Sequence, residues 1–273
     1  MVVLKVSLKA TMNARIIGNG EDTVILAHGF GGDQSIWEKI LPSLTQRYRV
    51  LVFDWNFSGA CKDSKAYDAL KYSSLDVFAN DLIDLVDELK LRDAILVGHS
   101  MSAMIGCLAS IKRPDLFKKL VLVGGSPRYI NCEGYEGGFE KSDVEQIFLN
   151  IETNFIAWAS YFSTLVVDSN DPFSVEKFSK SLGRMRPEVA LSVAKTIFCS
   201  DFRDCLDKVR VPCTIIQTTN DIVVPISVVQ YMEKKIKGDV TVEIVEGDGH
   251  FPMLTNENLL LDVFDKVLKS DAY

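Results

Sequence analysis

A short apolar run that leads into Gly98-His99-Ser100-Met101-Ser102 limits what this chain can fold into more than any other segment. The run is residues 94–97, and the small and apolar residues 103–108 that follow predict a helix. A serine between small residues at such a strand-to-helix turn is typical of a nucleophile elbow, in which the hydroxyl points out over the edge of the sheet. The N-terminus of the helix behind it favours developing negative charge. The pattern predicts a serine nucleophile, with Ser102 in the place of the usual glycine.

Strand-like runs recur along the chain, with amphipathic stretches between them. They are continuous and rich in Val, Ile and Leu, as expected for strands covered on both faces. The runs occupy residues 23–27, 49–53, 94–97, 120–123, 213–218 and 241–245. Apolar residues repeat at helical spacing over residues 75–89 and 259–268. This alternation predicts an α/β fold with a mostly parallel, doubly wound sheet.

The alternation of strands and helices stops between residues 129 and 201. After a turn-rich segment at 131–138, the pattern predicts helices at residues 143–155, 157–165, 174–185 and 187–198. An all-helical insertion that follows the nucleophile strand and helix is placed to cover the site. We therefore expect a core of residues 1–128 and 202–273, with residues 129–201 inserted as a four-helix lid.

The serine needs a base, because a hydroxyl is a weak nucleophile at neutral pH. The chain has only three histidines, and His250 lies on a Gly-rich turn after the run 241–245, where it can reach over Ser100. Asp221 follows the run 213–218 and would hold the imidazole in one tautomer. In hydrolases with a nucleophile elbow, the nucleophile comes first along the chain, then the acid, then the histidine. Ser100, Asp221 and His250 follow this order. We expect Ser100, Asp221 and His250 to form a catalytic triad.

Simpler interpretations of these residues exist. A Gly-x-Ser-x-small sequence often marks an ordinary turn, His250 has the setting of a surface-loop histidine, and Asp221 that of an aspartate that forms a turn. Asp248 is a rival acid, but its nearness in sequence places its carboxylate poorly for the outer ring nitrogen of His250. The agreement of order, strand context and spacing favours the triad with Asp221.

A second glycine-rich motif, His28-Gly29-Phe30-Gly31-Gly32, follows the run 23–27. In this fold the loop after that strand supplies one N–H of an oxyanion hole, and the residue after the nucleophile supplies the other. We therefore expect the N–H groups of Phe30 and Met101 to form the oxyanion hole, with glycines that let the backbone approach a substrate closely. A phosphate-binding loop is the weaker alternative, because no Lys follows and no full dinucleotide fingerprint is present.

The predicted lid is rich in large apolar side chains. Most are expected to pack helix against helix, and a subset that faces the sheet would form an apolar pocket above Ser100, suited to a small ester or lactone. The candidates are Tyr129, Phe139, Ile147, Phe148, Phe155, Trp158, Tyr161, Phe162, Leu165 and Phe198.

Composition narrows the function classes. The formal charge of the 273 residues is −7, from 30 Lys and Arg against 37 Asp and Glu, and no basic cluster indicates binding to nucleic acid. No apolar run has the length of a membrane span, and residues 1–8 alternate like a first strand rather than a signal peptide. The six scattered cysteines lack a Cys-x-x-Cys pair. We expect reduced thiols, no metal and no cofactor, in a cytoplasmic or nuclear protein.

Several motifs together resemble those of the plant strigolactone and karrikin receptors, most closely the karrikin-insensitive (hyposensitive-to-light) branch. They are residues 28–37 (HGFGGDQSIW), 98–106 (GHSMSAMIG), 126–129 (SPRY), 135–139 (YEGGF), 185–187 (MRP) and 248–252 (DGHFP). The similarity covers nearly the whole chain, including the predicted lid, and Ser102 is normal for this family. It implies an α/β-hydrolase fold and a butenolide receptor that is also a slow hydrolase.

In this family the serine attacks the butenolide ring and the histidine can be modified by the ring fragment. Rearrangement of the lid then recruits an F-box leucine-rich-repeat protein and a repressor protein. By position, the resemblance implies the triad Ser100, Asp221 and His250. The residues implied to bind substrate are His28, Phe30, Tyr129, Phe139, Ile147, Trp158, Phe162, Ile197, Phe198 and Val223.

Residues 54–59 (DWNFSG) depart from the family, which has a glycine-rich loop after that strand. The added aromatic residues Trp55 and Phe57 are expected to alter the neighbourhood of the lid, and with it ligand preference and partner docking. Two other function classes stay open. One is an efficient carboxylesterase for small esters without a signalling role, and the other is a binding module that keeps the triad residues without using them.

Overall fold

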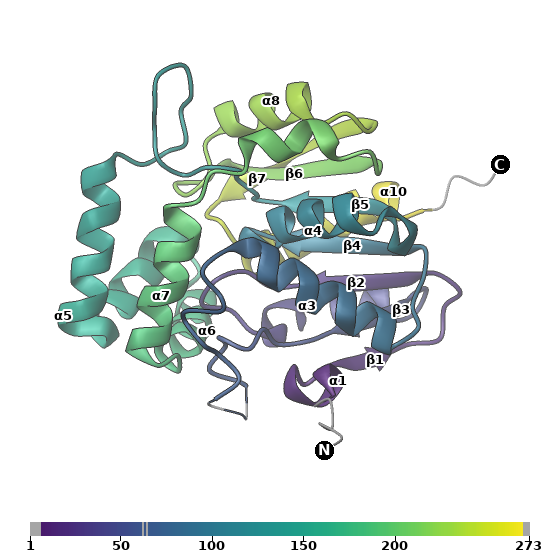
Figure 1. Cartoon of the computed structure of the whole chain (residues 1–273), viewed down its shortest axis with the longest axis horizontal. Helices are drawn as coiled ribbons and strands as arrows, with labels where there is room; N and C mark the ends of the chain where they lie inside the picture. The colour runs from purple at the N-terminus through teal and green to yellow at the C-terminus, as the bar shows by residue number, and fades with distance from the viewer. Residues whose placement is uncertain (1–6, 62, 64, 270–273) are drawn as a thin grey trace.

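The computed structural model describes residues 7–61, 63 and 65–269, and these residues form one seven-stranded sheet (Figure 1). The strand order is β1-β3-β2-β4-β5-β6-β7, in which β1 pairs antiparallel with β3 and the other neighbours are parallel. The strands are β1 (Arg15–Ile17), β2 (Thr23–Ala27), β3 (Arg49–Val52), β4 (Ala94–His99), β5 (Phe117–Val123), β6 (Cys213–Asn220) and β7 (Val240–Asp248). Every residue of β2 and β4 is buried, as predicted for strands covered on both faces.

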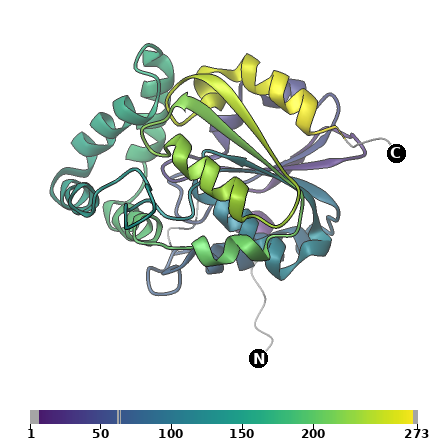
Figure 2. The same ribbon diagram turned by 90° about the horizontal axis from the view of Figure 1, so that it is seen from above.

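Helices lie on both faces of this sheet. Figures 1 and 2 show α3, α4 and α8 on one face and α10 on the other, so the predicted doubly wound sheet is confirmed. The helices of this layered core are α1 (Leu8–Thr11), α2 (Leu41–Leu44), α3 (Leu75–Glu88), α4 (Met101–Lys112), α8 (Ile226–Lys235), α9 (Pro252–Thr255) and α10 (Glu257–Val267). Short 3-10 helices occupy Gln34–Trp37, Pro114–Leu116 and Arg203–Lys208.

The helix α3 shows why the sequence pattern works. Ser74 caps it by accepting a hydrogen bond from the N–H of Asp76. The apolar residues that repeat at helical spacing, from Leu75 to Val86, are buried and form the stripe that faces the core.

Three α-helices of the described residues fall between β5 and β6 and lie together against one end of the sheet (Figure 1). They are α5 (Lys141–Val166), α6 (Pro172–Gly183) and α7 (Pro187–Phe198). The backbone of Asn154 is not helical, with φ −154° and ψ 78°, and its side chain accepts a hydrogen bond from the N–H of Ala157. The two helices expected at 143–155 and 157–165 are therefore the halves of one kinked element, and Asn154 caps the second half.

The strand expected at residues 1–8 falls mostly on residues 1–6, which lie outside the described residues. Leu8 begins the helix α1, which the Ser7 side chain caps. The edge strand of the described sheet is β1, whose three residues are exposed or half-buried and carry no alternating signal. Within the described part of the chain, no helix is both long and apolar enough to cross a membrane. All six cysteines are free thiols.

Candidate active site

Ser100 occupies the turn between β4 and α4 in a strained conformation. Its φ of 57° and ψ of −122° lie in a region that residues with a side chain rarely adopt. The N–H of Ser100 donates to the carbonyl oxygen of Val123 at 2.8 Å, which ties the turn to the neighbouring strand. A Cβ at Gly98 would lie 2.4 Å from the carbonyl oxygen of Ser102, so the sharp turn requires glycine there. The local geometry is that of the elbow that the sequence predicts.

Asp221 follows β6 and meets His250 at the end of β7. The Nδ1 atom of His250 lies 2.7 Å from Oδ2 of Asp221, and both side chains are almost fully buried. The carboxylate also accepts from the N–H of Val223 at 2.8 Å and from the amide of Gln217 at 2.9 Å. Burial opposes ionisation of Asp221, but its electrostatic interaction and hydrogen bond with the His250 ring, with these two donors, hold its pKa below the ordinary value.

The hydrogen bond to Asp221 determines which ring nitrogen of His250 carries the proton. A carboxylate only accepts, so Nδ1 carries the proton and Nε2 keeps its lone pair. Nε2 is buried and has no hydrogen-bond partner among the described residues, and His250 lines the same cavity as Ser100. A lone pair placed there can take a proton from the Ser100 hydroxyl, through a hydrogen bond that in such sites often tightens only when substrate binds.

The rival acid Asp248 has a different partner. Its Oδ1 accepts from the side-chain amide of Asn220 at 2.6 Å, across the end of the β6–β7 pair. The carboxylate that contacts the ring of His250 is therefore that of Asp221.

His99 holds the His250 loop in place, a role that the sequence did not indicate. Its Nε2 lies 2.8 Å from the carbonyl oxygen of His250, and a carbonyl accepts, so Nε2 is the protonated nitrogen. Burial, and then the neighbouring His250, lower the pKa of His99 to about 3, so the ring stays neutral. Its place beside Ser100 in the motif was the only available signal.

Gly124, at the end of β5, makes room for the imidazole. A Cβ at this position would lie 2.9 Å from Cε1 and 3.1 Å from Nδ1 of His250, and the φ of Gly124 is +58°. We expect Gly124→Ala to displace the ring and to lower kcat about tenfold for any reaction that uses His250, because small misplacements of a catalytic group are costly.

Gly134 offers a matched control for this substitution. It also has a positive φ, +71°, but no atom lies within 4 Å of the position of its Cβ. Gly134→Ala is therefore expected to cost about 1–2 kcal/mol of backbone strain without touching the site. Steady-state kinetics and thermal unfolding of both variants separate the two effects, and equal activity losses would rule out crowding of His250.

The loop after β2 lies directly over Ser100. A Cβ at Gly29 would lie 2.8 Å from Cβ of Ser100, so only glycine allows this approach. Phe30 and Met101 are both buried, and none of the hydrogen bonds of the described residues uses their N–H groups. Met101 is also the first residue of α4, where N–H groups lack intrahelical acceptors. The loop and the helix thus bring two free donors to the neighbourhood of the nucleophile.

A small apolar cavity of about 30 Å³ lies at Ser100 and His250. Six of the residues expected to bind substrate line it: Phe30, Tyr129, Phe162, Ile197, Phe198 and Val223. Three other residues of the lining were not predicted to bind substrate: Val166, Phe178 and Phe251. Burial raises the pKa of the Tyr129 hydroxyl well above its ordinary value, so this group stays protonated.

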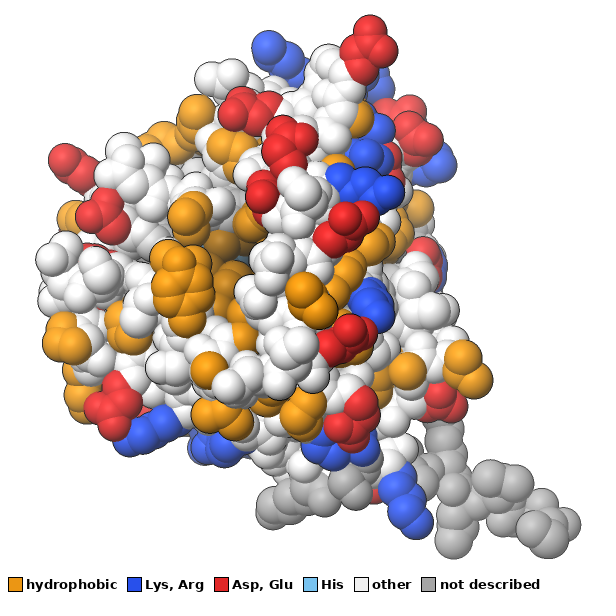
Figure 3. All heavy atoms as spheres, turned by 90° about the vertical axis from the view of Figure 1, so that its left-hand side faces the viewer, with side chains coloured by type: hydrophobic (Ala, Val, Ile, Leu, Met, Phe, Trp, Pro, Cys, Tyr) orange, Lys and Arg blue, Asp and Glu red, His pale blue; other side chains and the backbone are white. Residues whose placement is uncertain are grey.

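A second, larger cavity of about 190 Å³ lies farther out, between the two halves of α5 and the loop after β6. Phe139, Ile147 and Trp158 line this outer cavity rather than the inner one. Phe162, Val166 and Val223 line both cavities and so separate them. Figure 3 shows apolar side chains gathered around a hollow on this side of the molecule. His28 lines neither cavity and is fully buried.

No group of three or more His, Cys, Asp or Glu lies close enough to hold a metal ion within the described ranges.

Comparison with known proteins decides the family. A family profile described as alpha/beta hydrolase fold matches residues 22–257. The strigolactone esterase D14 of Arabidopsis thaliana is 45% identical over 244 residues, which cover 89% of this chain and 91% of that protein. The chain belongs to the strigolactone and karrikin receptor family of α/β-hydrolases.

Both branches of this family match at nearly the same identity. The Karrikin insensitive 2 receptor CA of Petunia hybrida is 43% identical over 260 residues, which cover 95% of this chain and 96% of that receptor. Among solved structures, a hydrolase from Oleispira antarctica superposes with a TM-score of 0.92 at 32% identity and covers 97% of both chains. The fold and the family agree with the resemblance seen in the sequence motifs.

Proposed function

We propose that this protein is a receptor for butenolide ligands of the strigolactone or karrikin type and that it hydrolyses them slowly through Ser100, His250 and Asp221. The observation that carries the proposal is the 2.7 Å contact between Asp221 and His250, whose free Nε2 faces an apolar cavity shared with Ser100. The names of the two relatives, an esterase and a receptor, support both halves of the proposal.

The proposed reaction follows from the arrangement of these groups. Oγ of Ser100 forms a bond to the lactone carbonyl carbon while its proton passes to Nε2 of His250, and Asp221 stabilises the imidazolium. The negative oxygen accepts hydrogen bonds from the N–H groups of Phe30 and Met101. Collapse breaks the ring C–O bond of the lactone, and in an enol-ether-linked butenolide the freed oxygen becomes an aldehyde as the enol-ether C–O bond breaks. His250 returns the proton to the departing enol oxygen, and the ring fragment stays on Ser100 as an acyl ester. Water then hydrolyses the acyl-serine by the same route.

Ligand access requires movement of side chains. The inner cavity of about 30 Å³ has room for about two water molecules, whereas a small-molecule site usually encloses about 300–1,000 Å³. Because Phe162, Val166 and Val223 line both cavities, displacement of these residues would join the inner cavity to the outer one. We propose that α5, α6 and α7 act as a lid and that this rearrangement accompanies ligand binding.

The proposed receptor role includes protein partners. Large apolar side chains on α5 are exposed, among them Leu149 (51%), Ile156 (65%) and Tyr161 (63%). Such a surface suits protein contacts, and the rearranged lid is proposed to recruit an F-box leucine-rich-repeat protein and a repressor protein. This recruitment would take place in the cytoplasm and the nucleus.

Mass spectrometry of the intact protein after incubation with a panel of butenolides tests the proposal. We expect a mass increase equal to the butenolide ring fragment on His250 or Ser100, located by peptide mapping. An initial burst followed by slow turnover and a ligand-dependent change in melting temperature should accompany it.

A ligand of the same shape without the cleavable bond is the control. It should change the melting temperature but leave no adduct. No adduct and no turnover with any butenolide would contradict the proposal. Sustained fast turnover of simple esters without an adduct would instead identify a general carboxylesterase.

A further inference from the structure

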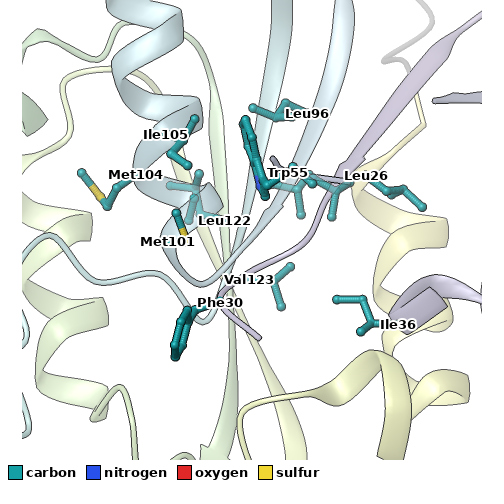
Figure 4. Packing of buried hydrophobic residues seen from close by; sticks show 14 of the residues in the cluster. Leu26, Phe30, Ile36, Trp55, Leu96, Met101, Met104, Ile105, Leu122 and Val123 are labelled. Carbon is teal, nitrogen blue, oxygen red and sulfur yellow. The ribbon is translucent and has the colours of Figure 1, made fainter. Parts of the chain in front are cut away.

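Trp55 is fully buried just after β3 and forms three hydrogen bonds beneath the loop that carries Phe30. Its backbone N–H donates to Nε2 of His28 at 3.1 Å. Its indole Nε1–H lies 3.0 Å from both the carbonyl oxygen of His28 and Oγ of Ser102. Figure 4 shows the indole among the buried side chains of β2, β4 and α4. A single side chain thus joins the loop after β2 to the first turn of α4.

These contacts fix the protonation of His28. A backbone N–H only donates, so Nε2 of His28 accepts and its proton resides on Nδ1, which lies 2.8 Å from the carbonyl oxygen of Gly29. Burial lowers the pKa of His28, so the ring is neutral. His28 is therefore a brace within the loop, consistent with its absence from both cavity walls.

The carbonyl oxygen of His28 receives two donors, the indole of Trp55 at 3.0 Å and the Ser102 hydroxyl at 2.6 Å. His28 lies two residues before Phe30, and Ser102 directly follows Met101. The three-way contact therefore sits between the two segments that carry the proposed oxyanion donors.

Aromatic neighbours hold the indole in the plane that these bonds need. The ring of Phe53 lies 4.9 Å from that of Trp55 at 88°, and the ring of Phe78 lies 5.6 Å away at 83°. Both are edge-to-face contacts that fix the direction of the N–H group. Trp55 thus packs inside the core, whereas Phe57 contacts the His28 ring and borders a groove with Arg184 and Val189 of the helical insertion.

We propose that Trp55 is a positioning residue, which sets the separation of the Phe30 and Met101 N–H groups through His28 and Ser102. The inference rests on the proposed function for its effect on catalysis, and on the hydrogen bonds alone for its effect on the loop. An oxyanion hole works only when its donors are held in place before the reaction, and small errors in position cost large factors in rate. The residue lies in segment 54–59, which is expected to depart from the family's glycine-rich loop.

Trp55→Phe tests the proposal, because it keeps an aromatic ring and removes the indole N–H. We expect kcat to fall about tenfold with KM changed by less than about twofold, since the donors act mainly on the transition state. Hydrogen exchange of the peptide that spans residues 24–32 should become at least about tenfold faster, because the His28 carbonyl loses one of its two donors.

Trp37→Phe is the matched control. Trp37 is equally buried, but its indole Nε1 has no hydrogen-bond partner among the described residues. The same atoms are lost there without a hydrogen bond, so kcat and the exchange of residues 24–32 should stay within about twofold of the parent protein.

Unchanged exchange of residues 24–32 in Trp55→Phe overturns the proposal whether or not the parent hydrolyses an ester. Faster exchange with an unaltered kcat in an active parent overturns the catalytic part. A parent that hydrolyses no substrate contradicts the proposed function, and the exchange measurement still decides whether Trp55 holds the loop.

Discussion

Replacing Ser100 with alanine is expected to lower kcat for ester or butenolide hydrolysis by about 10⁶-fold, because loss of the nucleophile alone costs a triad about as much as loss of all three members. The initial burst and the protein adduct should disappear with it. Ligand binding should persist, since the apolar walls of the cavity stay in place. Single-turnover kinetics and the ligand-dependent shift in melting temperature measure the two effects separately.

Ser110→Ala provides the comparison on the same helix. Ser110 is buried in α4, and its hydroxyl donates to the carbonyl oxygen of Cys107 at 2.8 Å, away from the cavity. The variant should hydrolyse ester at the rate of the parent. Full hydrolysis by Ser100→Ala would show that another group performs the chemistry, and the proposed mechanism would fall.

Asp221→Asn is expected to lower kcat by about 10⁴-fold, less than the loss of the serine, as in other triads. Asparagine can donate to Nδ1 of His250 and so favour the tautomer in which Nε2 carries the proton and cannot act as a base. Asp248→Asn is the matched change at the rival acid, whose partner is Asn220, and it should leave kcat within about twofold. The reverse order of effects would assign the acid to Asp248.

Asp221→Asn is also expected to change how the free energy of unfolding depends on pH. The pKa of Asp221 lies below its ordinary value of about 3.9, because His250 and its other donors outweigh burial. The ionised carboxylate therefore stabilises the fold above about pH 4, and this contribution is lost as the pH falls through the native pKa. Denaturant titrations should show the largest difference in free energy of unfolding between parent and Asp221→Asn above about pH 5. A difference that grows below pH 4 would contradict this sign.

Continuous apolar runs predicted the centre of the sheet well. The run at residues 23–27 coincides with β2, because a strand covered on both faces needs apolar side chains at every position. The strands β4 and β7 continue past the predicted ends through polar or glycine residues, to His99 and Asp248. The backbones of these extensions still pair with parallel neighbours. Backbone pairing does not require apolar side chains, so the apolar pattern did not reveal where these strands end.

Some site residues have roles that depend on local backbone geometry, and others have roles that depend on residues far away in the sequence. Ser100 and the glycines around it are dictated by local turn geometry, which a short motif carries. The roles of His28 and His99 depend on partners far along the chain, Trp55 and His250. Which aromatic side chains reach the inner cavity depends on the kink at Asn154, which helical spacing does not reveal.

The end of α5 is fastened to the catalytic loop itself. The N–H of His250 donates to the carbonyl oxygen of Val166 at 2.7 Å, and Gly249 packs against the same turn of backbone. If the insertion swings, this point is the pivot, and the opposite half of α5, from Lys141 to the bend at Asn154, travels farthest. A ligand would then enter beside the first half of α5, while His250 keeps its hydrogen bond to Asp221.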